Sequence, residues 1–272
     1  MDQAEEYLRK ALEIRLKLYG EEHDDVAHSY NNLGMLYQDQ GRLDQAKEYL
    51  RKALEIQLKL YGEEHGDTAT CYNNLGRLYQ DQGRLDQAEE YLRKALEIQL
   101  KLYGEEHGDV ADCYNNLGKL YQQQSRVDQA EEYLQKALEI RLKLYGEEHG
   151  DVANCYNILG ILYQDQSKWN LAEEYLRKAL EILMKLYGEE TDDVATTYSG
   201  LGLLYYYKNE LGLAEEYGQK ALIVCTKIKG KEHPNTIALE KFMAQIYKKA
   251  EQKKCGNKFQ KFAAKLLGKR PL

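Results

Sequence analysis

The chain has few residues that interrupt or cross-link a fold. Only two prolines, Pro234 and Pro271, occur among its 272 residues, so almost nothing breaks a long succession of helices. No apolar run approaches the roughly 20 residues that span a bilayer, so the sequence offers no membrane-spanning helix. Residues 1–6 are acidic and helical in character, and we expect them to be neither a secretory nor a transit peptide.

Signatures of catalysis are also missing. The sequence contains no phosphate-binding loop, no Ser/His/Asp constellation and no Cys-x-x-Cys motif. Of its five cysteines, Cys71, Cys113 and Cys155 recur at one repeat position, which predicts small buried thiols that stay reduced in the cytoplasm. The net charge of −7 argues against nucleic acid as the main partner. We therefore expect no enzyme, no cofactor and no metal.

What the chain does have is a repeat of 42 residues. Tyr-Gly pairs begin at residues 19, 61, 103, 145 and 187. Leu-Gly pairs recur in step, beginning at residues 33, 75, 117, 159 and 201. A fixed period of about 20 to 50 residues is typical of stacked arrays, in which each unit buries its apolar face against its neighbours.

Each repeat predicts two helices, shown by the first full one. Residues 26–40 place small and apolar side chains at i, i+3, i+4 and i+7, and residues 44–60 form a second apolar stripe. Asp25 and its equivalents are good N-cap residues, and Gly41 ends the first helix. The equivalents of Gly41 are Gly83, Ser125, Ser167 and Asn209. We expect the two serines to be weaker helix stops than glycine or asparagine.

Glycine also occurs in the middle of each first helix, at Gly34 and its equivalents. Glycine costs about 1 kcal/mol there relative to alanine, so its fivefold use indicates close approach of two helices. Ala46 and Ala53 are the expected small partners on the second helix. No segment alternates with a period of two, so we expect no β-sheet.

The repeat resembles a known family. Its first full copy reads Tyr30-x2-Leu33-Gly34-x2-Tyr37-x8-Ala46-x3-Leu50-x2-Ala53, which is similar to the tetratricopeptide repeat (TPR) without a gap. The long period, the Tyr-Gly-x-x-His linker and the Asn-Asn-Leu runs resemble the kinesin light chain and nephrocystin subtype. The resemblance covers residues 2 to about 250. It implies an all-α, right-handed superhelical solenoid of antiparallel helix pairs whose first helices line a concave groove.

We predict a TPR array over residues 1–250. A lone second helix at residues 2–19 is followed by repeats that start near residues 25, 67, 109, 151, 193 and 235. Residues 251–272 carry seven Lys/Arg and one Glu, which predicts a degenerate basic closing helix and tail. Two alternatives for residues 253–269 stay open, a basic amphipathic helix that binds an anionic membrane or a partner, and disorder.

The groove positions implied by the resemblance vary along the chain, whereas the buried stripe hardly changes. The predicted peptide-binding residues are Asn32, Asn74, Arg77, Asn116, Lys119, Ile158, Ile161, Leu203 and Tyr207. The amides and cations suit a carboxylate or a peptide backbone, and the later, apolar residues suit an aromatic or aliphatic anchor. The alternative is that Arg77 and Lys119 are solvated charges that balance Asp81 and Asp112.

These observations favour a cytoplasmic, non-enzymatic adaptor that holds an extended, acidic and hydrophobic segment of a partner protein. The resemblance implies cargo recognition of the kinesin light chain kind. Two other hypotheses stay open, a structural module that self-associates through its unpaired N-terminal helix and the sensor part of a larger signalling protein. Membrane binding is expected only through residues 253–269. We expect the linker histidines to pack in the linkers or to cap helices, and we expect Trp169 to be a core residue.

Overall fold

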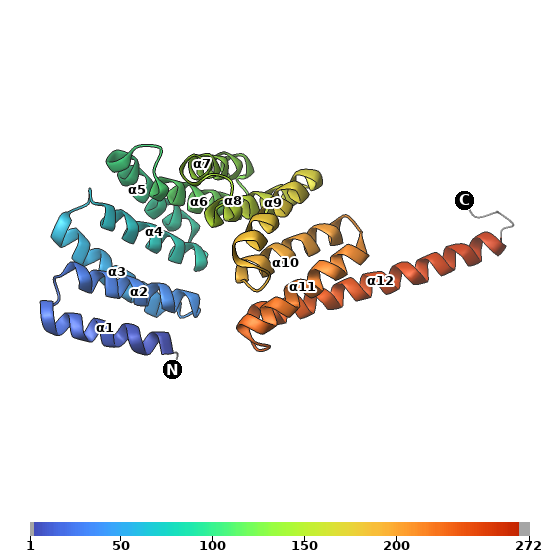
Figure 1. Cartoon of the computed structure of the whole chain (residues 1–272), viewed down its shortest axis with the longest axis horizontal. Coiled ribbons are helices and arrows are strands. Elements are labelled where there is room, and N and C mark those ends of the chain that lie inside the picture. The colour runs from blue at the N-terminus through green and yellow to red at the C-terminus, as the bar shows by residue number, and fades with distance from the viewer. Residues whose placement is uncertain (1–2, 267–272) are drawn as a thin grey trace. The chain divides into compact units, whose positions relative to one another are not determined.

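The computed structural model describes the backbone of residues 3–266 and the side chains of residues 3–253. Over these residues it contains twelve helices and no strand, which confirms the predicted all-α class (Figure 1). The helices are α1 (Gln3–Tyr19), α2 (Asp24–Asp39), α3 (Leu43–Tyr61), α4 (Gly66–Asp81), α5 (Leu85–Tyr103), α6 (Gly108–Gln123), α7 (Val127–Tyr145), α8 (Gly150–Asp165), α9 (Trp169–Tyr187), α10 (Asp192–Tyr207), α11 (Leu211–Lys229) and α12 (Pro234–Leu266).

The chain divides into two compact units, Met1–Leu144 and Tyr145–Leu272. In the first unit α2 packs on α3 and α4 on α5, and α1, α3 and α5 each also contact the first helix that follows them. In the second unit α8 packs on α9 and α10 on α11, and α11 contacts α12. The first helix of each repeat begins one residue before the predicted repeat start.

The N-caps differ from the prediction. His23 caps α2, and its Nδ1 accepts the backbone N–H of Asp25 at 3.2 Å. Asp25 therefore lies inside the first turn, where its own backbone N–H is one of the donors that the cap satisfies. The His23 ring stacks on Tyr19 with centroids 4.2 Å apart, which explains why Tyr-Gly-x-x-His recurs. His65, His107 and His149 cap in the same way, so the predicted capping role of the linker histidines is confirmed.

The glycines in the middle of the first helices lie against leucine side chains. A Cβ atom on Gly34 would lie 2.6 Å from Leu50 Cγ, and Gly76, Gly118 and Gly160 have the same contact with Leu92, Leu134 and Leu176. The predicted close approach of the two helices is thus confirmed, although leucine is the residue that needs the space. The expected partners Ala46 and Ala53 are fully buried beside this contact.

Buried tyrosines connect successive helix pairs. The Tyr37 hydroxyl on α2 donates to Glu5 Oε1 on α1 at 3.0 Å, and Glu5 also accepts from Arg42 at 2.8 Å. The same three-residue contact recurs as Tyr121, Glu89 and Arg126, and as Tyr205, Glu173 and Lys208. Because the glutamate belongs to the preceding pair, each contact holds two neighbouring repeats together.

The last helix is continuous. α12 runs from Pro234 to Leu266, so it contains the expected first helix of the sixth repeat and continues into the segment expected to close the array. The side chains from residue 254 onward and all of residues 267–272 lie outside the described part. The apolar and basic faces expected of residues 253–269 stay a prediction.

Candidate interaction surfaces

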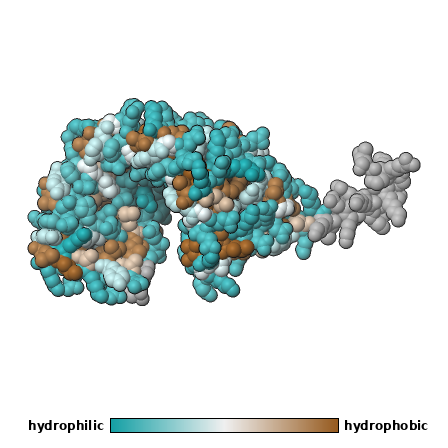
Figure 2. Space-filling model, viewed as in Figure 1, coloured by the Kyte–Doolittle hydropathy of each residue, from teal (hydrophilic) through white to brown (hydrophobic). Residues whose placement is uncertain are grey.

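The second unit contains an open pocket of about 460 Å³, which we call the apolar pocket. Its wall is built mainly from first helices, α8, α10 and α12, with one residue of α11. The lining residues are Ile161, Gln164, Asp165, Asp192, Ala195, Thr196, Ser199, Gly200, Leu203, Cys225, Asn235, Ala238, Leu239 and Phe242. Figure 2 shows hydrophobic patches around these helices on an otherwise mostly hydrophilic surface.

Two of the predicted residues of the second unit line this pocket. Ile161 on α8 is half-buried, and Leu203 on α10 is 37% exposed, so both offer carbon surface to a ligand. Ile158 is only 8% exposed and lies outside the lining, because it packs into the core. Tyr207 also lies outside the lining, and its exposed ring stacks on Trp169 with centroids 6.0 Å apart. Trp169, predicted as a core residue, is half-buried.

The sequence analysis missed the wall supplied by α12. Ala238 and Phe242 stand 42 residues after Thr196 and Gly200, so one further step of the repeat would have found them. Gly218 explains how α12 comes close. It replaces the leucine of the earlier hairpins, and a Cβ there would lie 2.7 Å from Met243 Sδ and 3.6 Å from Phe242 Cε1. Phe242 also contacts Tyr206 edge to face, with centroids 5.8 Å apart.

Six of the fourteen lining residues of the apolar pocket are polar, namely Gln164, Asp165, Asp192, Thr196, Ser199 and Asn235. Asp192 forms an ion pair with Lys229 at 2.6 Å. Cys225 is buried, and its Sγ lies 3.4 Å from the Thr236 hydroxyl. Ile161, Leu203, Leu239 and Phe242 supply the large apolar side chains of the wall, which suit an apolar side chain of a ligand.

The predicted polar residues of the first unit, which we call the polar wall, are Asn32, Asn74, Arg77, Asn116 and Lys119. Two of its asparagines also serve the fold. Asn74 Nδ2 donates to Asn31 Oδ1 at 2.9 Å, and Asn116 Nδ2 donates to Asn73 Oδ1 at 3.0 Å. These bonds join successive first helices, and Asn74 is only 5% exposed. Asn32, in contrast, is exposed.

Arg77 is the polar-wall cation that is best placed for a ligand. Its side chain is half-exposed and forms no ion pair or hydrogen bond with any residue that the structure describes. Asp81, its expected balancing charge, accepts a hydrogen bond from Gln38 at 2.6 Å. Asp112 pairs with the buried guanidinium of Arg141. These contacts weaken the alternative in which Arg77 serves only to balance Asp81.

The cysteines have little chemical reactivity. Cys71, Cys113 and Cys155 are buried, as predicted. Burial, aided by nearby aspartates, raises the pKa of Cys71 and Cys113 to about 12. At neutral pH these thiols are protonated, and a protonated thiol is a poor nucleophile and a poor metal ligand.

The family of this helical repeat follows from a comparison with known protein families. A model of the tetratricopeptide repeat matches residues 1–59, 25–101, 78–143, 109–185, 151–222 and 193–254. The chain belongs to the tetratricopeptide repeat family. TPR proteins are generally scaffolds for protein–protein interaction. No curated protein matches the chain.

Solved structures support the predicted subtype. The crystal structure of BtubC (BKLC) from P. vanneervenii is 27% identical, with a TM-score of 0.68 over 85% of this chain and 93% of that one. A putative kinesin light chain of Podosopora anserina with nearly identical TPR-like repeats is 25% identical, with a TM-score of 0.59 over 76% and 99%. The repeats are therefore of the kinesin light chain type. The apo form of RapI, at 18% identity and a TM-score of 0.57, shares the fold.

None of the helices in the described part of this TPR chain combines the length and the apolar character needed to cross a membrane.

Proposed function

We propose that this TPR protein is a non-enzymatic, cytoplasmic adaptor that binds an extended segment of a partner protein on its first helices. The observation that carries the proposal is the apolar pocket between α8, α10 and α12. Pockets of about 300 to 1,000 Å³ with mostly apolar walls are typical of ligand sites. A pocket of about 460 Å³ is large enough for one leucine or tryptophan anchor.

The polar wall supports an acidic character for the partner segment. Arg77 offers a planar guanidinium that can donate two parallel hydrogen bonds to a carboxylate. Lys119 adds a second cation three residues after Asn116 on α6. The apolar pocket would therefore suit a hydrophobic anchor of a partner segment, and Arg77 would suit an acidic residue of such a segment. The repeats resemble those of kinesin light chains, and we therefore propose that this chain recognises its partner as a kinesin light chain recognises cargo.

The apolar pocket is tested with a fluorescein-labelled peptide that carries one tryptophan flanked by aspartate and glutamate. Leu203→Asp places a charge in the pocket wall and should weaken binding at least tenfold, because a buried unpaired carboxylate costs free energy. Leu213→Asp is the matched control, since Leu213 on α11 is 36% exposed, as Leu203 is 37% exposed, and lies outside the pocket. Equal affinities of the two variants would show that the pocket does not hold the anchor.

The polar wall is tested with Arg77→Glu in the same assay. Affinity should fall, and the salt dependence of binding should decrease, because one charge pair is lost. Arg84→Glu makes the same charge change at an exposed residue whose contact is the Tyr79 ring, 4.8 Å away. Arg84→Glu should bind the peptide as the wild type does. If both reversals act alike, the effect comes from net charge and not from the polar wall.

A second function, self-association, is favoured by the face of α1. Tyr7 is 64% exposed and Ile14 is 56% exposed, whereas Ile56, the equivalent of Ile14 on α3, is 8% exposed. In a self-associating module this face would pack on another copy. Light scattering over a range of protein concentrations tests this, and Ile14→Asp should abolish any rise in mass. A constant monomer mass at every concentration would exclude the second function.

A further inference from the structure

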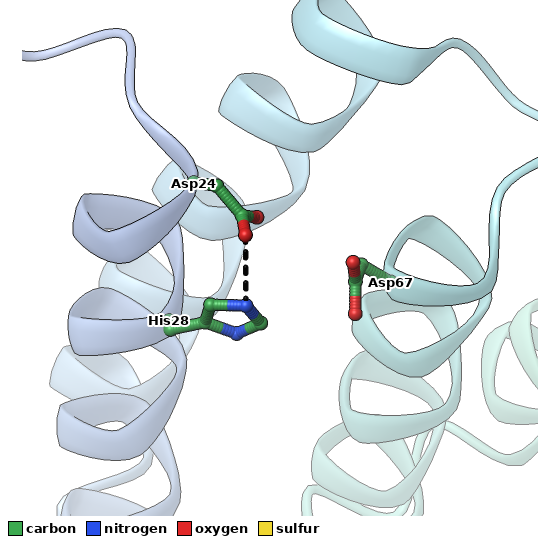
Figure 3. A group of neighbouring side chains, drawn as sticks. All are labelled: Asp24, His28 and Asp67. Carbon is green, nitrogen blue, oxygen red and sulfur yellow. Dashed lines mark ion pairs between the residues drawn. The ribbon is translucent and has the colours of Figure 1, made fainter.

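A group of potential metal ligands bridges the first two full repeats. Asp24 and His28 stand one turn apart on α2, and Asp67 stands in the first turn of α4. One ligand atom from each residue lies within 4.8 Å of the others. Among the described residues, this is the one group of three or more such side chains close enough to share a metal ion. His28 Nε2 and Asp24 Oδ2 are 3.2 Å apart. Figure 3 shows Asp67 facing this pair from the neighbouring helix.

A buried amide gives a second, independent indication of a ligand. Gln57 on α3 is 1% exposed, and its Nε2 donates to Asp24 Oδ1 at 2.8 Å. Its Oε1 has no hydrogen-bond partner among the described residues. Gln57, His28 and Asp67 line one small cavity of about 20 Å³, the size of a single water or ion. A buried acceptor without a partner costs roughly 1 to 3 kcal/mol, so a ligand in this cavity would remove that cost.

The other repeats carry different residues at these positions. In the next repeat the positions of Asp24 and His28 hold Gly66 and Thr70. The buried Oε1 atom of Gln99 again has no hydrogen-bond partner among the described residues, so the unpartnered glutamine recurs there while the imidazole and the second carboxylate do not. In the third, Arg141 replaces the glutamine and pairs with Asp112, so a protein cation neutralises the carboxylate. Only the first repeat combines two carboxylates, an imidazole and a glutamine without lysine or arginine among them.

We propose that Asp24, His28, Asp67 and the Oε1 atom of Gln57 bind one divalent transition-metal ion of the Zn²⁺ class. An imidazole nitrogen with carboxylate oxygens is a common ligand set for Zn²⁺, and the nitrogen disfavours Mg²⁺ and Ca²⁺. A water could satisfy Gln57 but would not neutralise two carboxylates. Zn–N and Zn–O bonds are about 2.0 to 2.2 Å, so the side chains must move slightly inward. The ion would tie α2 and α3 to α4.

The test uses isothermal titration of the full chain with ZnCl₂, alone and with excess MgCl₂. One Zn²⁺ per chain should bind, and Mg²⁺ should not displace it. Asp24→Gly with His28→Thr copies the residues of the next repeat, which this fold already accommodates. The double variant keeps every linker histidine and should bind Zn²⁺ at least tenfold more weakly at this site. Equal binding by both proteins, or no binding by either, would overturn the proposal.

A transplant provides the converse test. Gly66→Asp with Thr70→His completes the same four residues around Gln99 and Asp109 in the second repeat. A Cβ on Gly66 would lie 2.8 Å from the Tyr103 hydroxyl, so that exposed ring must turn aside. The stoichiometry should rise from one Zn²⁺ to two in a protein whose circular dichroism stays helical. An unchanged stoichiometry in that helical protein would contradict the assignment of these residues as ligands.

Discussion

In the first unit the wall positions of the first helices carry Asn32, Asn74 and Asn116, whereas the same repeat positions of the second unit carry Ile158, Gly200 and Phe242. The amides of Asn74 and Asn116 in the first unit donate hydrogen bonds to asparagines of the preceding first helix. In the second unit Gly200 removes the side chain, and the ring of Phe242 forms part of the pocket wall instead. One helix framework thus carries two kinds of residue at the same repeat positions.

The packing within the helix pairs also differs between the two units, at one position of the repeat. Gly118 in the first unit and Gly160 in the second both face a leucine of the paired helix. At the fifth pair Gly202 faces Gly218, and a Cβ on Gly202 would lie 3.1 Å from the Gly218 nitrogen. The space that leucine fills elsewhere goes to Met243 and Phe242 of α12. The apolar pocket therefore depends on a change in the core as well as on the wall residues.

The largest expected effect breaks the framework that the two units share. In Gly118→Leu the new Cβ would lie 2.6 Å from Leu134 Cγ and 3.3 Å from the Ala130 carbonyl oxygen. The helices must separate, which should lower the free energy of unfolding by about 3 kcal/mol or more. Urea unfolding followed by circular dichroism measures it.

The control for that variant is Gly212→Ala on α11. A Cβ there has no atom within 4 Å, so the substitution should stabilise the protein by about 0.5 to 1 kcal/mol through helix propensity. If Gly118→Leu were tolerated as well as Gly212→Ala, the glycines would not mark close helix contacts in either unit.

A smaller effect on stability is expected at low pH, where a half-buried glutamate of each unit becomes protonated. Burial alone would raise the pKa of Glu173, but hydrogen bonds from Lys208, Tyr205 and Arg177 lower it to about 2. The unfolded chain has a value near 4.5, so this stabilisation is complete above about pH 4.5 and is lost as the pH falls toward 2. It amounts to about 2 to 3 kcal/mol. Urea unfolding of wild type and Glu173→Gln at pH 7 and pH 2.5 should show the difference shrinking in acid.

Glu89 is the matching residue of the first unit. Its pKa is also lowered, since hydrogen bonds from Arg93, Arg126 and Gln124 outweigh burial. The tyrosine hydroxyl lies 3.2 Å from Glu89, against 2.7 Å at Glu173, so Glu89→Gln should cost less. A larger loss in Glu89→Gln would reverse this comparison of the two units.

The helix pairs could be predicted from the sequence because the same residue pattern recurs in five copies. Apolar periodicity and the recurring glycines are local signals, and the structure follows them. The histidine caps were harder to assign, since aspartate is the commoner cap and only the stacked Tyr19 ring shows why His23 takes that role. Each of these features depends on residues within one repeat or its nearest neighbour.

The pocket and the metal-ligand group depend on longer relations. Phe242 lies one repeat beyond the last position considered, and its approach requires Gly218. The ligand group needs Asp67 beside His28, residues that share no local pattern and meet only because α2 and α4 are neighbours. Ile158 is 8% exposed, so its part in a groove stays a prediction.

The smallest effect should be equal in both units. Ser125 and Ser167 end α6 and α8 with φ of 60° and 57°, where Gly41 and Gly83 have 72° and 71°. The backbone bonds of these caps match, since the N–H of Ser125 and of Ser167 reaches the carbonyl three residues back at 3.0 and 2.9 Å, as Gly41 does at 2.9 Å.

A serine in the left-handed region costs roughly 1 to 2 kcal/mol, partly offset by the greater freedom of glycine in the unfolded chain. Ser125→Gly and Ser167→Gly should therefore each stabilise the protein by about 0.5 to 1 kcal/mol, and Gly41→Ser should cost the same. Thermal unfolding of the single and double variants checks both the size and the additivity. A gain confined to one unit would mean that the helix ends, like the wall residues, differ between the two units.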